Sequence, residues 1–368
     1  MTGTPDEPRI AVIGAGIVGL CAAYALHELG VTPAVYERGR PGQGQSGGES
    51  RLFRHAHDDE RLVRFAIESR GIWRAWETAF GRTLVSGDGV VALGDGAIER
   101  LSTLEAVGGV DAGEVDADEL AVRLPVLGWY DGPAVLDRDG GAIDAQGAIA
   151  SLAGALGDAI VTDEVLSVRP LPDDRVEIRT SSSTEIFDRV LVAAGHGASL
   201  LWRGFGLAVP VTSSAHVRLT YDLIDAPPAQ VACLQDGSGV WGETGIYGAP
   251  VPGNALYAIG LSETVDARPD GGVVDPTGLA ELVDRTNAYV ERALPGLRPE
   301  AVGVRHCWVT ELSWSEDGVG VWEAGGALLV AGHNLFKQAP ALGRALAKAL
   351  VGEALKQDLR PESRLGHP

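Results

Sequence analysis

Cysteine is scarce in this chain of 368 residues, which contains only Cys21, Cys233 and Cys307. Their odd number and wide separation argue against a disulfide framework and against a zinc site, and no other metal site is predicted. Unpaired cysteines are typical of a reducing compartment, so we expect a cytoplasmic protein.

Basic residues are also few, since 30 lysines and arginines are outnumbered by 50 aspartates and glutamates, which gives a net charge of −20. This charge argues against nucleic acid and against an anionic membrane surface as partners. The sequence has no run of about 18 apolar residues, so we expect no membrane span, and residues 1–8 are too short and too acidic for a secretory signal. An anionic substrate would need a local basic site. We expect a monomer or a homodimer.

Residues 9–37 form the most informative stretch of the chain. A short apolar strand is predicted over residues 10–13, a helix over 17–29 and a second strand over 31–36, and Gly30 is a natural end for the helix. Strand, helix and strand in this order predict the first unit of a dinucleotide-binding fold.

Three glycines between the first strand and the helix follow the spacing GxGxxG. Gly14 permits the tight turn that leaves the strand, Gly16 lets a pyrophosphate approach the backbone, and Gly19 lets the helix pack close to the sheet. The helix N-terminus offers N–H groups and a partial positive charge to phosphates, and Glu37 can accept hydrogen bonds from a ribose. Dinucleotide binding is therefore predicted, and a Gly-rich turn without a ligand is the alternative.

The remaining pattern places α/β segments at the start, middle and end of the chain, with β-rich segments between them. Helices are predicted over residues 60–80, 98–124, 146–156, 277–294 and 341–355, with a turn over 333–337. Strands are predicted over residues 85–93, 159–168, 175–180, 184–190, 190–195, 215–221, 230–234, 240–247, 255–261, 301–312 and 327–331, and the first of them has a Gly-Asp-Gly turn inside it. We therefore expect a two-domain α/β protein whose nucleotide-binding sheet is assembled from separated segments, whereas nicotinamide enzymes usually keep this unit continuous.

Three segments, GAGIVG near the N-terminus, VLVAAG in the middle and LLVAGHNLFK near the C-terminus, occur in the order used by FAD amine oxidases of the D-amino-acid oxidase superfamily. Within it, the chain most resembles the group of monomeric sarcosine oxidase, N-methyltryptophan oxidase and pipecolate oxidase. The most specific segment is GESRLFRHA, residues 48–56, in which two arginines three residues apart follow an acid and a hydroxyl residue. The resemblance implies a Rossmann-like FAD-binding domain of glutathione-reductase type over residues 1–82, 145–208 and 301–368, and an antiparallel-sheet substrate domain over 83–144 and 209–300.

The resemblance also implies which residues contact FAD. The ADP half would be bound by Gly14, Gly16, Gly19 and Glu37. The backbone of Val165 would contact the adenine, and Ala194 and Gly195 would line the dinucleotide. The residues along the pyrophosphate and the flavin ring would be Ser50, Arg51, Gly332, Asn334, Leu335 and Phe336. Cys307, in a Cys-x-x-Thr segment, matches the family cysteine that is joined to the flavin 8α carbon through a thioether. The alternative for Cys307 is a small buried hydrophobic side chain.

Arg54 and Lys337 resemble the pair that binds the substrate carboxylate, and Tyr247 matches a tyrosine of the substrate pocket. A guanidinium offers two parallel donors to a carboxylate, and an ammonium adds a point charge. The alternative is that each cation pairs with an exposed acid of this chain. A lysine and a histidine that the family places near flavin N5 fall on Ala258 and Ser262 here, so a cation that would assist O₂ reduction is missing.

We therefore expect an FAD-dependent oxidoreductase that oxidises the C–N bond of an amino acid or related amine. Arg54 and Lys337 would hold the carboxylate while hydride passes from the α-carbon to flavin N5, which leaves an imine. The changed pocket favours a specialised biosynthetic substrate, and O₂ would be the acceptor only if Ala258 is compensated. The alternatives are a nicotinamide-dependent dehydrogenase and a flavin subunit without chemistry of its own in a larger complex.

Overall fold

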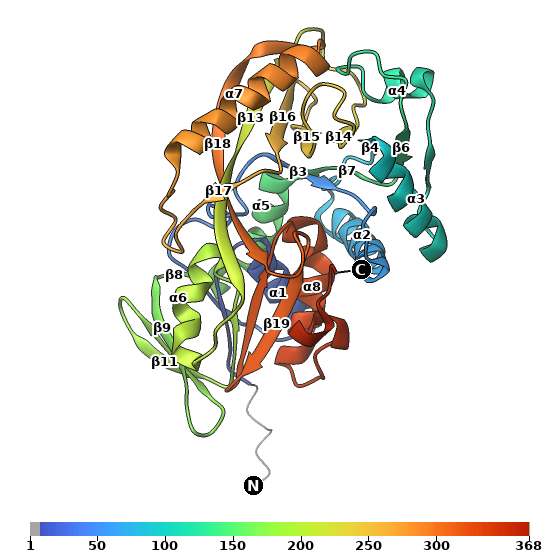
Figure 1. The fold of residues 1–368 in the computed structure, drawn as a ribbon. Helices are drawn as coiled ribbons and strands as arrows, with labels where there is room; N and C mark the ends of the chain where they lie inside the picture. Colours follow the sequence, from blue (N-terminus) through green and yellow to red (C-terminus); the bar gives the residue numbers. More distant parts are fainter. Residues whose placement is uncertain (1–7, 368) are drawn as a thin grey trace.

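A six-stranded sheet forms the lower half of the molecule in Figure 1, in the computed structural model, which describes residues 8–367. Residues 1–7, which belong to the segment considered as a secretory signal, lie outside this description. In spatial order the strands are β19 (Val319–Ala324), β20 (Ala327–Gly332), β12 (Arg189–Val192), β1 (Ile10–Ile13), β2 (Ala34–Glu37) and β8 (Ile160–Thr162). All neighbours are parallel except β19 and β20. The carboxyl ends of the parallel strands therefore meet at one edge, where α/β folds bind their ligands.

Helices cover one face of this sheet and share a single hydrophobic core with it. They are α1 (Ile17–Glu28), α2 (Glu60–Phe80), α5 (Ala145–Leu156) and α8 (Leu335–Leu350). The backbones of α1 and α8 approach closely, because a Cβ on Gly343 would lie 2.6 Å from the carbonyl carbon of Cys21. Within residues 8–367, no helix combines the length and the hydrophobicity needed to cross a bilayer.

Gly343→Ala is expected to lower the free energy of unfolding by about 1–3 kcal/mol, because the added methyl group pushes α1 and α8 apart. Gly154→Ala is the matched control, since Gly154 is exposed in α5 and an added Cβ would have no neighbour within 4 Å. Alanine there should stabilise the protein by about 0.5–1 kcal/mol. Urea unfolding measures both values, and equal stability of the two variants would contradict the tight helix contact.

The opposite face of the six-stranded sheet packs against a smaller antiparallel sheet and a short helix. These elements are β9 (Val165–Pro170), β10 (Val176–Thr180), β11 (Thr184–Phe187) and α6 (Ala198–Trp202). The central strands are therefore buried on both sides, which explains their nearly continuous apolar sequence.

A nine-stranded, mostly antiparallel sheet forms the upper half of the molecule (Figure 1). In spatial order its strands are β17 (Val265–Asp266), β13 (Val211–Leu223), β16 (Leu256–Leu261), β15 (Ile246–Pro250), β14 (Cys233–Asp236), β4 (Val90–Leu93), β6 (Ala134–Asp137) and β5 (Ala112–Glu114), and β18 (Leu297–Leu312) pairs with the other edge of β13. Helix α7 (Pro276–Ala293) covers one face. Alternate residues of β13, such as Val217 and Leu219, are buried beneath α7, so their neighbours His216 and Arg218 project to the opposite face.

A two-stranded ladder of β3 (Ser50–Phe53) and β7 (Gly141–Asp144) completes the sheets of the described chain. The pairing of β18 with β13 places the start of the predicted third FAD-binding segment, residues 301–312, in the nine-stranded sheet. The division of the chain into domains stays a prediction.

Several predicted elements are wrong in their bounds. Residues 98–124 are not one helix, because α3 (Asp95–Val107) ends where Gly108 and Gly109 have φ values of +73° and +80°, and β5 precedes α4 (Ala117–Arg123). The strand predicted over residues 159–168 is divided into β8 and β9. The turn predicted inside residues 85–93 is present, with Gly87 and Gly89 at φ +70° and +95°, so regular strand begins only at Val90. Glycines at positive φ interrupt regular structure within residues 98–124, and they do the same directly after Ser86.

The predicted turn over residues 333–337 and helix over 341–355 are also wrong. Helix α8 begins at Leu335, directly after Asn334 with its left-handed φ of +54°, and Pro340 lies inside the helix. Proline usually marks a helix boundary, which is why the sequence predicted a later start. The correction matters for function, because it places Lys337 on the first turn of a buried helix.

Candidate active site

A pocket of about 840 Å³ is lined by residues of both large sheets, a volume typical of cofactor and small-molecule sites. All the predicted site residues line it except Gly19 and Ser50. They are Gly14, Gly16, Glu37, Arg51, Arg54, Val165, Ala194, Gly195, Tyr247, Cys307, Gly332, Asn334, Leu335, Phe336 and Lys337. The pocket thus joins the predicted nucleotide site to the predicted substrate site.

The nucleotide end of the pocket lies at the carboxyl ends of β1 and β2. Gly14 has φ +101°, and a Cβ there would lie 2.6 Å from the carbonyl oxygen of Ala193, so the turn requires glycine. The carboxylate of Glu37 accepts hydrogen bonds from the N–H groups of Ala15 at 2.9 Å and Gly39 at 3.1 Å. These bonds fix Glu37 beside the glycine turn, where a ribose would lie.

The two predicted residues outside the pocket have structural positions. A Cβ on Gly19 would lie 1.9 Å from the carbonyl oxygen of Gly14, so Gly19 sets the close packing of α1 on the turn. Ser50 is 1% exposed, and its carbonyl oxygen accepts hydrogen bonds from Arg51 and Arg218. Ser50 does not line the pocket itself, and its place along the pyrophosphate and the flavin ring stays a prediction.

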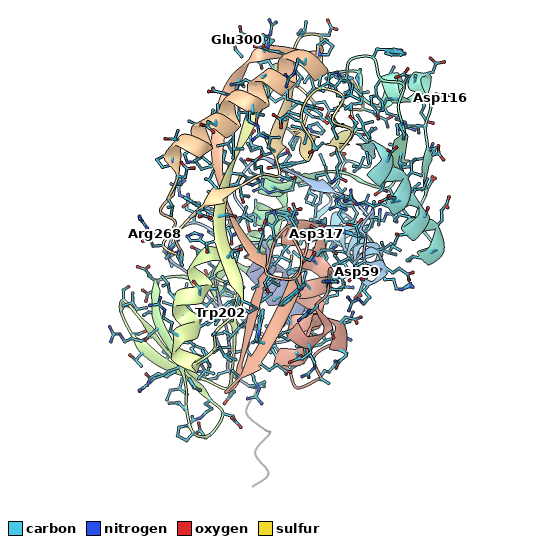
Figure 2. The ribbon with its side chains drawn as sticks, viewed as in Figure 1. Asp59, Asp116, Trp202, Arg268, Glu300 and Asp317 are labelled. Carbon is cyan, nitrogen blue, oxygen red and sulfur yellow. The ribbon has the colours of Figure 1, made fainter. Side chains whose placement is uncertain are left out.

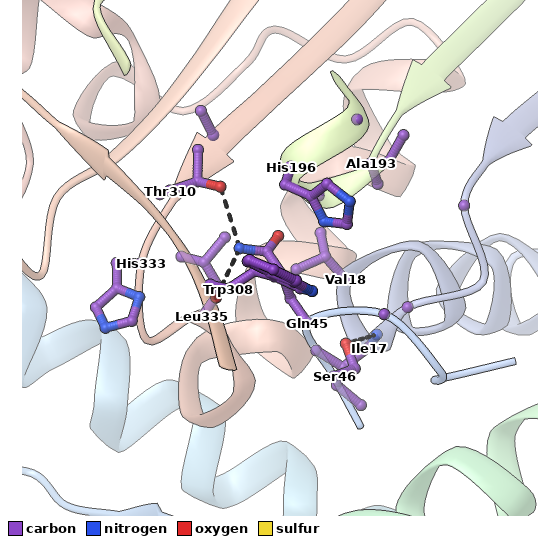
Figure 3. Close-up of a pocket in the computed structure, with 18 of the residues that line it drawn as sticks. Ile17, Val18, Gln45, Ser46, Ala193, His196, Trp308, Thr310, His333 and Leu335 are labelled. Carbon is purple, nitrogen blue, oxygen red and sulfur yellow. Dashed lines mark hydrogen bonds between the residues drawn. The ribbon is translucent and has the colours of Figure 1, made fainter. Parts of the chain in front are cut away.

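The polar loop before β3 crosses the pocket. Figure 3 shows the Gln45 side chain reaching Thr310 and the backbone of Trp308, while Ser46 lies beside Ile17. Gln45 donates from Nε2 to both of its partners at 3.1 Å, and the N–H of Ile17 donates to Ser46 Oγ at 2.9 Å. The loop thus connects the N-terminus of α1 with strand β18 around the pocket.

Arg54 and Lys337 meet at the other end of the pocket, but on a shared internal acid. Asp317, in the turn between β18 and β19, accepts from Arg54 Nη2 at 2.6 Å and from Lys337 Nζ at 3.3 Å. Figure 2 shows Asp317 near the middle of the molecule, and its side chain is 18% exposed. The prediction brought the right two cations together and missed the carboxylate that joins them.

Asp317 has two further partners in this cluster. His57 Nδ1 lies 3.0 Å from one carboxylate oxygen, and Asn334 Nδ2 donates to the other at 2.9 Å. Burial alone would raise the pKa of Asp317, but Lys337 and Arg54 hold it well below its usual range. Burial and the charge of Arg54 lower the pKa of His57 to about 3. His57 is therefore neutral near pH 7, and Asp317 is ionised.

Two side chains of α2 fix the backbone of Lys337. Its carbonyl oxygen accepts hydrogen bonds from Ser69 Oγ at 2.8 Å and Trp73 Nε1 at 3.4 Å, both on α2. Burial is the main reason that its pKa falls to about 8, against the charge of Asp317, which raises it. The ammonium is thus the main form at neutral pH.

Cys307 is partly buried on β18 and lines the pocket opposite His216 of β13. Burial would raise the pKa of its thiol, but a hydrogen bond from the His216 side chain and the charges of Arg51 and Arg218 lower it to about 7. The other two cysteines are fully buried, and all three are free. Among residues 8–367, no cluster of His, Cys, Asp and Glu side chains is placed to hold a metal ion.

Residues 9–349 match the family described as FAD dependent oxidoreductase, abbreviated DAO, and the chain belongs to this family. It is 26% identical to human peroxisomal sarcosine oxidase over 386 residues, covering 98% of this chain and 96% of that protein. A putative sarcosine oxidase of Caenorhabditis elegans is 27% identical over 141 residues, 37% of each chain.

Solved structures share the fold across the whole chain. NikD in its open form, an unusual amino acid oxidase essential for nikkomycin biosynthesis, has a TM-score of 0.82 at 23% identity and covers 99% of this chain and 98% of its own. L-proline dehydrogenase from P. horikoshii has a TM-score of 0.82 at 19% identity, covering 97% and 98%. Glycine oxidase from Geobacillus kaustophilus has a TM-score of 0.77 at 20% identity, covering 98% and 100%.

The predicted α/β fold, the flavoenzyme family and the FAD cofactor are confirmed. The nicotinamide alternative is wrong because the family uses FAD, and the chain is an oxidoreductase rather than a subunit without chemistry. The cytoplasmic location and the oligomeric state stay predictions.

The pocket fits FAD on its own geometry. The side-chain-free turn at Gly14 and Gly16 leads to the N-terminus of α1, which favours a diphosphate, and Glu37 is fixed where a ribose can reach it. When bound, FAD supplies the hydride acceptor.

Proposed function

We propose that this enzyme oxidises the C–N bond of an amine that also carries a carboxylate, and that the product is an imine. The observation that supports this most is that the FAD pocket continues into the cluster of Arg54, Lys337 and Asp317. Arg54 and Lys337 share the single carboxylate of Asp317, and His57 is neutral. Burial and the charge of Asp317 raise the pKa of Glu316, which lines the same pocket, and so favour its uncharged form. A substrate carboxylate would complete the charge balance of a buried site, where such pairing is strongest.

Each residue of the cluster has a proposed role. Arg54 uses Nη1 to bind the carbonyl oxygen of Ala56 and Nη2 to bind Asp317, so its remaining N–H groups would bind the substrate carboxylate. Lys337 would add charge, and Asp317 would hold both cations in place. Tyr247, which lines the same pocket, would pack against the substrate.

Anaerobic mixing of the purified enzyme with a panel of amino acids and N-alkyl amino acids tests this proposal. A substrate should bleach the flavin band, and the same amine as its methyl ester should bleach it far more slowly. If dithionite reduces the flavin but no amine on the panel does, the proposed function is wrong.

The substrate and the electron acceptor are proposed to differ from those of sarcosine oxidation. Ala258 is buried and does not line the pocket, and Ser262 lines it with its hydroxyl bound to the Gly245 carbonyl oxygen at 2.8 Å. Neither side chain supplies a charge to the pocket. We infer a specialised amine as substrate, in keeping with the structural likeness to NikD, and altered reactivity of the reduced enzyme with O₂.

We also propose that Cys307 is joined to the flavin through a thioether. The thiolate is the nucleophilic form, and a thiol pKa of about 7 beside the cofactor pocket makes it available at neutral pH.

Cys307→Ser is expected to release all of its flavin on acid precipitation, whereas wild-type protein keeps the yellow colour in the pellet. Cys233→Ser is the matched control, because Cys233 is fully buried away from the pocket and should leave the flavin attached. Free flavin in the supernatant of precipitated wild-type protein would disprove the covalent bond.

A further inference from the structure

Two arginines of the pocket lack an acidic partner. Arg218 is only 6% exposed and Arg51 is partly buried, and both line the pocket. In the part of the chain that the structure describes, neither forms an ion pair with a carboxylate, whereas Arg54 and Lys337 share Asp317. An unpaired buried charge is unfavourable, and it is unexpected in a chain with a net charge of −20.

The hydrogen-bond acceptors of the two guanidinium groups are neutral oxygen atoms. Arg218 donates from Nη1 to the carbonyl oxygen of Ser50 and from Nη2 to Ser50 Oγ at 3.3 Å, and its Nε has no hydrogen-bond partner. Arg51 donates to the carbonyl oxygens of Ser50, Gln45 and Gly47. These acceptors orient the arginines but carry no charge of their own.

Strand pairing places Arg218 on the wall of the pocket. Arg218 lies opposite Gly260, which in turn lies opposite Tyr247. The guanidinium carbon of Arg218 is 6.0 Å from the centre of the Tyr247 ring. Thr220 and Ala258 form the next pair on the same face of the sheet. Arg218 therefore places a cation close to position 258, whose alanine side chain carries no charge.

Cys307 lies opposite His216 in the ladder of β13 and β18, and Arg218 is two residues further along the same face of β13. The charges of Arg51 and Arg218 help to lower the pKa of the Cys307 thiol. Arg51 also lies near the ring of Phe336, with 5.9 Å from its guanidinium carbon to the ring centre. Cys307 and Phe336 are assigned to the flavin, and Tyr247, beside Arg218, is assigned to the substrate pocket. The proposed carboxylate site is the separate cluster around Asp317. The positive charge of the two arginines therefore faces the cofactor.

We propose that Arg218, together with Arg51, is the electrostatic partner of the flavin ring and holds the negative charge that the ring gains on reduction. A hydride carries two electrons and one proton, so its transfer from a neutral amine gives the ring one negative charge and leaves an iminium with one positive charge. Fixed cations stabilise such a developing charge most strongly in a site shielded from water. This inference concerns the cofactor, and its test requires no amine substrate.

Sulfite provides the test, because it adds to flavin N5 and gives the ring a negative charge. Arg218→Met should raise the dissociation constant of the sulfite adduct at least tenfold, and each factor of ten corresponds to about 30 mV in a two-electron potential. Arg218→Lys keeps the charge, so its dissociation constant for sulfite should stay within about threefold of the wild-type value. Arg298→Met is the control, since Arg298 is exposed on β18 outside the pocket, and it should match wild type.

Flavin content is measured first, and Arg218→Gln, which keeps a donor for Ser50, replaces the methionine variant if that variant loses flavin. A wild-type sulfite affinity and midpoint potential in either neutral variant would overturn the inference. A higher KM for the carboxylate-bearing amine with unchanged sulfite affinity would also overturn it, because Arg218 would then belong to the substrate site.

Discussion

Arg54→Met is expected to lower kcat/KM for a carboxylate-bearing amine at least 100-fold, mainly through KM, with near-normal flavin content. A hydrogen bond to a charged group contributes about 1.5–3 kcal/mol, and a factor of 100 corresponds to about 2.7 kcal/mol. The Arg54 side chain is only 11% exposed, so in the variant water cannot easily take over its hydrogen bonds to the substrate carboxylate. Steady-state kinetics with wild type and variant measure the effect.

Two controls separate carboxylate binding from a general loss of structure. Arg64→Met removes an exposed arginine that pairs with Glu60 on α2, and it should leave KM unchanged. The kcat/KM for the methyl ester of the substrate should fall only a little when Arg54 is mutated, because the ester has no carboxylate for Arg54 to bind. An unchanged KM for the free acid in Arg54→Met would remove Arg54 from the substrate site.

Asp317→Asn is expected to lower the free energy of unfolding by about 3–5 kcal/mol, since it leaves the cations of Arg54 and Lys337 buried without a counter-ion. Asp158→Asn is the control, because Asp158 is exposed and forms no ion pair in the described chain; it should change stability by less than about 0.5 kcal/mol. Urea unfolding near pH 7 gives both values.

The pH dependence of this variant follows from the lowered pKa values. In wild type, the pKa of Asp317 is lower in the folded protein than in the unfolded chain. Its contribution to the free energy of unfolding is therefore complete above the unfolded value of about 3.9 and is lost as the pH falls toward the folded value. Without Asp317, the pKa of Lys337 falls below its value of about 8. The folded variant then binds fewer protons than the unfolded chain, so its stability rises with pH. Wild-type stability also rises with pH above about 8, where its own Lys337 loses its proton. The difference from wild type should therefore narrow as the pH rises toward about 8 and stay constant above it, and a difference that is constant below pH 8 would contradict the direct contact.

The sequence predicted the nucleotide end of the molecule well because local rules govern it. The order of β1, turn and α1, the turn at Gly14 and the acid at Glu37 all depend on residues close together in the chain. The start of α8 was missed because Pro340 suggested a boundary, and tertiary packing against α1 and α2 overrides that local preference.

The charged centre of the site was predicted only in part because it depends on contacts between distant segments. Asp317 is 263 residues from Arg54 in the sequence, and an acid in a Glu-Asp-Gly turn is usually solvated. Arg218 stands in an alternating strand, where a polar position normally faces water. The signal that could have found it is His216 two residues earlier, because two polar side chains on one face of a largely buried strand suggest a lined cavity.

The pairing of β13 with β18 sets limits on how this enzyme can change. Figure 1 shows the two strands as long adjacent ribbons beneath α7, and together they carry Arg218, His216 and Cys307 into the pocket. Single substitutions at these positions would retune the chemistry on an unchanged scaffold. Insertion of one residue into β13, by contrast, would rotate the arginine and the histidine into the apolar layer under the helix and bring valine and leucine to the cofactor. Diversification of this pocket should therefore proceed by exchange of side chains along these two strands, and length variation should be confined to the turns that join them.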